Sequence, residues 1–237
     1  MKSIGITDVG RRREKNQDQF FTGTIHDHHL LLIADGMGGH KSGEIASAMA
    51  IEIVVNCAQE KLNSHPPIFT FMKEALFSAN EMIYKKSLTD DSMQGMGTTF
   101  VSAIVYGSQA YISHIGDSRA YLYQNGSLEQ LTNDHSLINE LKKKNEYNQD
   151  EEKNIRHIVT RSLGTDEYVE ADYELIDFKE GDLLLLCTDG LSDDVSLKKM
   201  ENILRQDVQL EDKAQNLMNE ALSAGGKDNI TLCLMSY

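Results

Sequence analysis

The sequence predicts an α+β fold in which antiparallel sheets are covered by helices. Predicted strands follow one another as meanders joined by short turns, and predicted helices come in pairs between those meanders. A doubly wound parallel sheet would instead alternate single strands with single helices. The chain has 237 residues, 40% of them hydrophobic, which is enough to bury a large core.

The N-terminal part is predicted to hold a strand at 2–8, a basic loop at 10–15 and a hairpin with strands at 18–25 and 29–35. The run from Leu30 to Ala34 is apolar at every position, which is typical of a strand buried on both faces. Four residues join the two strands, namely His26, Asp27, His28 and His29. Such a group could bind a metal, but its place in a turn favours a solvated loop.

Two helices are predicted next, at 43–62 and from Pro66-Pro67 to about Ser87. Apolar residues recur at helical spacing in both. In the first helix they include Ala46, Ala50 and Val54, and in the second Phe71, Ala75, Ala79, Met82 and Ile83. We expect the two helices to pack antiparallel on a sheet.

The rest of the chain is predicted to form a meander and then a mixed segment. Strands are expected at 98–106, 109–115, 119–124 and 127–131, and the Asn125-Gly126 pair is a strong signal for a two-residue hairpin turn. Residues 136–163 are polar and mostly helical in pattern, as in a surface insertion. Strands near 170–176 and 182–188, helices at 196–206 and 210–223, and a last strand at 229–236 complete the prediction.

Composition excludes several classes of protein. Lys and Arg number 23 against 37 Asp and Glu, and the net charge of −14 argues against a nucleic-acid binder. No apolar run approaches the roughly 18 residues of a membrane span, and the N-terminus does not resemble a signal peptide. Cys57, Cys187 and Cys233 are far apart and form no C-x-x-C pair, so we expect neither a disulfide framework nor a cysteine zinc site. These features favour a cytoplasmic protein.

Four aspartates are the candidates for chemistry. Asp35 and Asp189 each follow five or six apolar residues and precede a glycine, Asp117 follows a strand, and Asp228 precedes one. A single Asp-Gly pair commonly marks only a turn. Carboxylates that converge from several strand ends would repel one another unless divalent cations bound between them, and oxygen ligands suit Mg²⁺ or Mn²⁺.

A basic run at 11–15 is a second candidate feature, since beside an acidic cluster it could hold an anion while the metals hold its other side. Arg matches the geometry of phosphate with two parallel hydrogen bonds, although such runs usually lie in solvated loops. Other phosphate and nucleophile motifs are not supported. His40 stands where a P-loop needs glycine before Lys41-Ser42, and no Gly-x-Ser-x-Gly elbow occurs.

Taken in order, these segments resemble the metal-dependent protein phosphatase family, type 2C, in its compact bacterial form. The first match is Thr7-Asp8-Val9-Gly10 with Arg13-x-x-Asn16-Gln17-Asp18, and the most specific is Ala34-Asp35-Gly36-Met37-Gly38-Gly39-His40. Further matches are Met96-Gly97-Thr98-Thr99, His114-Ile115-Gly116-Asp117-Ser118-Arg119, Asp134-His135-Ser136-Leu137, Thr160-Arg161-Ser162-Leu163-Gly164, Thr188-Asp189-Gly190-Leu191 and Gly226-Lys227-Asp228-Asn229-Ile230-Thr231. The resemblance covers nearly the whole chain.

The resemblance implies a single catalytic domain, 1–237, built as a four-layer sandwich. Two central antiparallel β-sheets would be flanked by α-helices on both faces, and residues 134–163 would form a flap beside the site. It also implies hydrolysis of phosphoserine and phosphothreonine in proteins, by attack of a hydroxide that bridges two Mg²⁺ or Mn²⁺ ions.

The same resemblance implies roles for individual residues. Asp35 would bridge both ions, the carbonyl of Gly36 would touch one, and Asp189 and Asp228 would complete the other. Asp117, with Asp189, would help to bind a third, weaker ion. Two further roles follow: Asp18 would orient the water between the ions, and Arg13 would hold the substrate phosphate.

Two positions leave alternatives open. Many family members carry Glu where this chain has Gln17, which removes one charge near a metal. A histidine near the second motif serves as general acid in the family, and His40 is the candidate here. The resemblance further implies phosphorylated protein substrates and an opposing serine/threonine kinase, and a lone compact domain suggests a monomer.

Two other readings remain. A non-catalytic phosphoprotein-binding relative would keep the fold, and a dedicated phosphatase for a sigma-factor regulator would usually carry a sensor domain, for which 237 residues leave no room.

Overall fold

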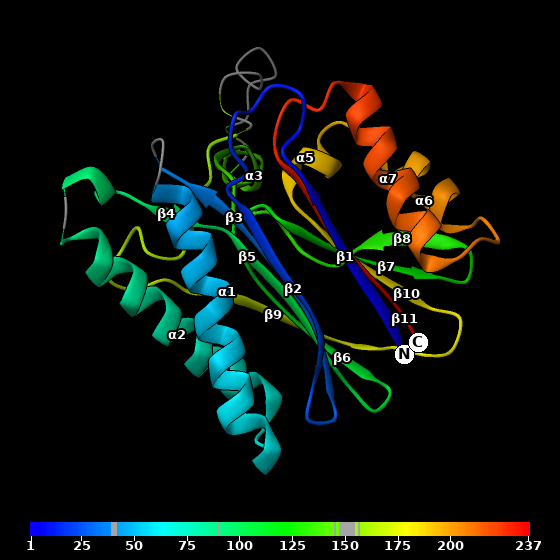
Figure 1. The fold of residues 1–237 in the computed structure, drawn as a ribbon, viewed down its shortest axis with the longest axis horizontal. Coiled ribbons are helices and arrows are strands. Elements are labelled where there is room, and N and C mark those ends of the chain that lie inside the picture. The colour runs from blue at the N-terminus through cyan, green and yellow to red at the C-terminus, as the bar shows by residue number, and fades with distance from the viewer. Residues whose placement is uncertain (39–41, 90, 145, 147–154, 156) are drawn as a thin grey trace.

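The computed structural model describes residues 1–38, 42–89, 91–144, 146, 155 and 157–237. These residues form two antiparallel sheets packed face to face, with helices on both outer sides (Figure 1). The predicted four-layer arrangement is therefore confirmed.

One sheet has five strands in the order β1-β11-β10-β7-β8. Its members are β1 (Lys2–Asp8), β7 (Arg119–Gln124), β8 (Ser127–Gln130), β10 (Leu183–Cys187) and β11 (Ile230–Ser236). The two ends of the chain lie side by side because β1 pairs with β11, with Lys2 opposite Ser236 (Figure 1).

The other sheet has the order β2-β3-β5-β6-β9, with a short β4 paired to β3. Its members are β2 (Asp18–Ile25), β3 (His28–Met37), β4 (Gly97–Thr98), β5 (Phe100–Tyr106), β6 (Gln109–Ile115) and β9 (Asp172–Asp177). The strand predicted at 98–106 is thus divided between β4 and β5. Asn125 and Gly126 both have positive φ in the β7–β8 turn, as its two-residue hairpin requires.

Helices cover each sheet from outside. The pair α1 (Ser42–Lys61) and α2 (Ile68–Ser87), with short 3₁₀ turns at Leu62–Ser64 and Asp91–Met93, lies on the six-stranded sheet. The helices α5 (Asp189–Ser192), α6 (Leu197–Leu204) and α7 (Leu210–Ala224) lie on the five-stranded sheet. No helix in the described part of the chain combines the length and apolar character that a bilayer span requires.

Three apolar layers hold the sandwich together, and they explain why β3 is apolar at every position from Leu30 to Ala34. Leu30, Leu32 and Ala34 pack under α1 and α2, whereas Leu31 and Ile33 face the other sheet. Successive side chains of a strand point to opposite faces, so a strand between two covered faces needs apolar residues at every position. The predicted double burial of this strand is confirmed.

Three details differ from the sequence prediction. Met82 is half exposed and does not lie on the buried face of α2, which Ala79 and Ile83 form. His28 is not in a solvated loop, because it opens β3 and is 1% exposed. In the segment 134–163 the described residues hold one clear helix, α3 (Leu137–Lys143), and 145, 147–154 and 156 lie outside the described residues.

Candidate functional site

A cavity of about 1100 Å³ opens at one end of the sandwich, and six of the predicted site residues line it together: Arg13, Asp35, Gly36, Asp117, Asp189 and Asp228. Asp18 is 3% exposed and lies beneath them. It is close enough for the charge of Asp228 to raise its pKa and for its own charge to raise the pKa of Asp35. His40 lies outside the described residues.

Strand pairing explains this convergence. Asp18 and Asp35 are direct cross-strand partners at the end of the β2–β3 ladder. In the other sheet β10 and β11 are neighbours, so Asp189, which begins the helix after β10, and Asp228, just before β11, are also brought together. One carboxylate pair thus comes from each sheet.

The glycines beside Asp35 and Asp189 permit close backbone packing. A Cβ on Gly36 would lie 2.1 Å from the carbonyl oxygen of Gly43 in α1. A Cβ on Gly190 would lie 2.0 Å from the carbonyl oxygen of Asn229. Neither position can carry a side chain, so glycine is what lets the backbone pack closely beside each of these aspartates.

Asp18 joins the two sheets at the floor of the cavity. Its Oδ2 accepts a hydrogen bond from Thr231 Oγ1 at 2.7 Å and another from Thr188 Oγ1 at 3.1 Å. Thr231 lies in β11 of the other sheet, Thr188 directly follows β10 of that sheet, and both threonines are fully buried. Their role was not predictable from the sequence, because a threonine in or beside a strand is ordinarily a sheet former.

The electrostatics of the cavity are strongly unfavourable to so many negative charges. Burial, and then the neighbouring Asp18 carboxylate, raises the pKa of Asp35 well above its ordinary value. Burial, followed by the charge of Asp117, does the same to the pKa of Asp189. Burial raises the pKa of Asp18 and that of Asp117 to about 6 each. Buried carboxylates that raise one another's pKa form a site that positive charge would stabilise.

Unpaired oxygens point to the same conclusion. Within the described ranges, neither Oδ1 of Asp18 nor Oδ1 of Asp189 has a hydrogen-bond partner, although both atoms are buried. A buried carboxylate oxygen without a partner destabilises the fold, and a hard cation bound to that oxygen would remove this cost. The donor set, carboxylates and a backbone carbonyl, fits Mg²⁺ or Mn²⁺ and contains no soft ligand.

The carboxylates do not all converge on one point. Among the described residues of this cavity, Asp189, Asp193 and His157 form a cluster whose possible ligand atoms lie within 4.8 Å of one another. Asp35 and Asp228 lie outside that cluster. Ligands spread over a cavity floor suit a pair of ions, which are about 3.5–4 Å apart in two-metal sites.

The loop that carries Arg13 is fastened by Asn229. The side chain of Asn229 donates to the carbonyls of Val9 and Lys15, and its Oδ1 accepts from the amide of Gln17 at 2.9 Å. Arg13 Nη2 lies 2.6 Å from Asp228 Oδ2 at the mouth of the cavity. The guanidinium is therefore presented beside the carboxylates, as predicted for a phosphate ligand.

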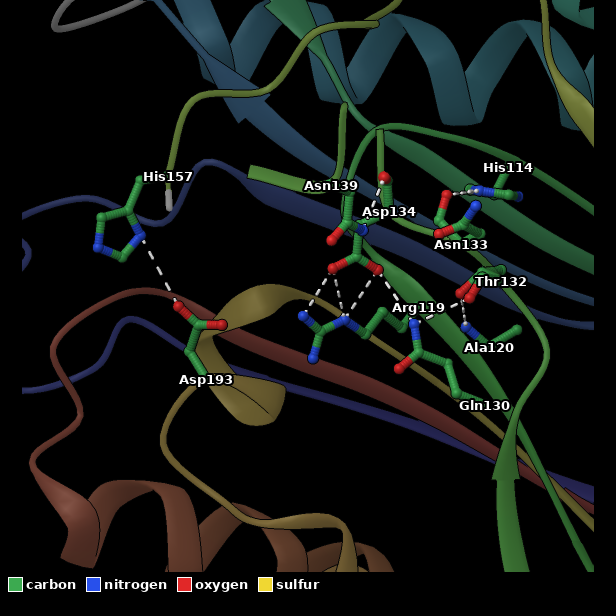
Figure 2. Close-up of polar contacts among 10 residues, drawn as sticks. All are labelled: His114, Arg119, Ala120, Gln130, Thr132, Asn133, Asp134, Asn139, His157 and Asp193. Carbon is green, nitrogen blue, oxygen red and sulfur yellow. Dashed lines mark hydrogen bonds and ion pairs between the residues drawn. The ribbon is translucent and has the colours of Figure 1, made fainter. Parts of the chain in front are cut away.

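The segment after β8 borders the cavity and is held by a partly buried ion pair. Arg119 binds both carboxylate oxygens of Asp134, at 2.7 to 3.1 Å, and Gln130 donates to the same carboxylate (Figure 2). Further along, Nδ1 of His157 lies 3.7 Å from Oδ2 of Asp193, across the cavity (Figure 2). Neither His157 nor Asp193 was a sequence candidate, since nothing in the chain between them indicates that they meet.

Comparisons with known proteins agree with this geometry. The family model described as Protein phosphatase 2C matches residues 9–224. The "Serine/threonine phosphatase stp" of Listeria welshimeri is 38% identical over 234 residues, covering 97% of this chain and 93% of that protein.

Solved structures give the same result. The S. agalactiae serine/threonine phosphatase superposes with a TM-score of 0.88 at 34% identity, covering 98% of both chains. The catalytic domain of the phosphatase PstP, in complex with 2 manganese ions, superposes with a TM-score of 0.85 at 31% identity, covering 98% of this chain and 96% of that one.

Proposed function

The chain belongs to the protein phosphatase 2C family, and from this premise we propose how its residues carry out the hydrolysis of phosphoserine and phosphothreonine in proteins. The chain is an enzyme, a metal-dependent protein serine/threonine phosphatase that uses Mg²⁺ or Mn²⁺. The observation that carries the residue roles is the group of mutually repelling, partly unsatisfied carboxylates at the cavity floor.

We assign the metal ligands from this group. Asp35 would contact both ions, the carbonyl of Gly36 one of them, and Asp189 and Asp228 the other, while Asp117 with Asp189 would hold a third, weaker ion. When bound, such ions lower the pKa of water and neutralise the charge of the phosphoryl group. The raised pKa values support these assignments, since carboxylates that repel one another gain most from a cation.

The remaining residues position the reactants. Asp18 has one oxygen held by Thr188 and Thr231, which leaves Oδ1 to accept a hydrogen bond from a water on the cavity floor. Arg13 lies at the mouth, where its guanidinium can exchange Asp228 for the phosphate oxygens of a substrate. Charge that develops on those oxygens then meets a fixed positive partner. His40 remains the predicted general acid for the leaving hydroxyl.

The same proposal extends to the cellular setting of the protein. Phosphorylated proteins are the substrate class, and a serine/threonine kinase would supply them. We further propose a cytoplasmic monomer in which residues 1–237 form one catalytic domain and 134–163 form its flap. The bridge between Ser136 and Val159 supports the flap assignment because it closes the two ends of that segment.

The test is turnover of a phosphothreonine peptide in Mn²⁺ or Mg²⁺ by the wild type and by Asp35→Asn. We expect hydrolysis that stops with excess chelator and with the variant, whereas Asp177→Asn, which changes an exposed carboxylate that pairs with Lys179, should retain it. Full activity in chelator would refute the metal mechanism. No turnover of the peptide or of a chromogenic phosphate ester, despite metal binding, would favour the non-catalytic alternative that Gln17 leaves open.

A further inference from the structure

A second group of metal-type side chains lies at the opposite end of β3 from Asp35. It consists of Asp27 in the β2–β3 turn, His28 at the start of β3, and His65 just after the turn that follows α1. Asp35 lies seven positions after His28 on this strand, a span of roughly 23 Å at the usual rise per residue. The group is therefore separate from the phosphatase cavity.

The three side chains present their ligand atoms to one another. Oδ1 of Asp27 lies 3.1 Å from Nδ1 of His28 and 3.9 Å from Nδ1 of His65, and the ligand atoms of all three lie within 4.8 Å. Two ligands of a tetrahedral zinc ion, each about 2.0–2.1 Å from it, are about 3.3 Å apart. The observed spacings need only a small contraction around such an ion.

His28 supplies an independent indication of a ligand. Its side chain is 1% exposed, and within the described residues its Nδ1 makes no hydrogen bond even though Asp27 is near in distance. A buried nitrogen without a hydrogen bond destabilises the fold, and a bound metal ion would satisfy it. Burial lowers the pKa of His28, which keeps the imidazole neutral, as a metal ligand must be.

The surrounding contacts hold the group in place. His26 Nε2 lies 3.0 Å from the carbonyl oxygen of Gln59 in α1, which fixes the turn that carries Asp27. The Tyr106 ring stacks on His28 with centroids 4.6 Å apart. His26 and His65 both adopt positive φ, a conformation that residues other than glycine seldom take.

We propose that Asp27, His28 and His65 bind one transition-metal ion, with Zn²⁺ as the best fit, at a site distinct from the Mg²⁺ or Mn²⁺ cavity. Two imidazoles and one carboxylate form the donor set of a three-ligand zinc site, with the fourth position open to water. Imidazole ligands suit zinc better than magnesium, so the two sites differ in metal class. Asp27 and His65 are both exposed, which gives an ion access from solvent.

The test is a Zn²⁺ titration of the full chain in competition with a chromogenic indicator. Asp35→Asn, Asp189→Asn and His157→Gln are combined as a background that removes zinc binding at the phosphatase cavity. We expect this background to bind Zn²⁺ with an affinity that depends on Asp27 and His65, and Co²⁺ in its place to show the visible absorption of a tetrahedral site.

Single changes added to this background then identify the ligands. His65→Gln and Asp27→Asn alter exposed side chains, so folding should be preserved, and each should weaken Zn²⁺ binding by at least about 10-fold. His29→Gln is the matched control, because His29 pairs with Thr24 and not with the cluster, and it should leave the affinity unchanged. No zinc binding by the background, or the same affinity in His65→Gln and Asp27→Asn, would overturn the proposal.

Discussion

Replacement of Thr231 by Val tests the structural role of Asp18 without leaving a cavity, because the two side chains have the same shape. A chain of hydrogen bonds leads to the carboxylate. Asn16 Nδ2 donates to Thr7 Oγ1 at 2.8 Å, and the Thr7 and Thr231 hydroxyls are 2.7 Å apart. Thr231 donates its one hydroxyl proton to Asp18, so Thr7 must donate to Thr231.

The magnitude follows from what the substitution removes. Thr231→Val deletes a hydrogen bond to a buried carboxylate, which contributes about 1.5–3 kcal/mol, and leaves Thr7 without its acceptor. Thr188 alone would then bind Asp18, so the pKa of Asp18, already about 6, should rise further. We therefore expect a loss of about 1.5–3 kcal/mol in the free energy of unfolding and an acidic limb of kcat/KM that moves to higher pH.

Urea denaturation and a pH–rate profile measure these two effects. Thr22→Val is the matched control, because Thr22 lies on the same strand as Asp18 and its buried hydroxyl has no hydrogen-bond partner in the described part of the structure. That variant should be as stable as the wild type or slightly more stable. The reasoning is refuted if Thr231→Val behaves like Thr22→Val, within about 0.5 kcal/mol and with the same pH profile.

Three further results are expected. Asp189→Asn should lower Mn²⁺-dependent turnover by at least about 100-fold. It should also raise the metal-free stability by on the order of 1 kcal/mol, because it removes a buried charge that its neighbours repel. A metal-free melting temperature at or below that of the wild type would contradict this. Asn229→Ala should lose three hydrogen bonds and about 2–4 kcal/mol of stability, measured by denaturation. Because the loop that carries Arg13 becomes looser, KM for a phosphopeptide should rise in steady-state kinetics. An unchanged KM would show that the loop needs no such anchor. The pKa of Asp18 rises from 3.8 in the unfolded chain to about 6 in the folded protein, so the folded protein binds this proton more tightly. Metal-free stability should therefore fall as pH rises from about 4 to about 6, by up to about 3 kcal/mol. Urea midpoints in chelator should show that fall, and midpoints in excess Mn²⁺ should not; a rise over this range in chelator would contradict it.

Patterns that are local in sequence were enough to predict most of the fold. The apolar run of β3 and the Asn125-Gly126 turn depend on neighbours in the chain, and both are confirmed. The face of α2 was predicted less well. Helical spacing places Met82 beside the buried stripe, and only the position of the sheet decides that Ile83 is covered while Met82 is not.

The aspartates of the site were predictable because each stands where an apolar strand begins or ends. Their supporting residues were not, since Thr231 lies 213 positions from Asp18 and Asn229 lies 212 positions from Gln17. Threonine in a strand and asparagine before one have ordinary local explanations. Their roles arise only when the ends of the two sheets meet.

The most direct measurement is the anomalous diffraction of crystals grown in Mn²⁺. We predict two manganese peaks in the cavity about 3.5–4 Å apart, with the Asp35 carboxylate touching both and Asp189 and Asp228 touching one. Peaks that avoid Asp35, or crystals soaked in Mn²⁺ with no peak among these three carboxylates, would contradict the account.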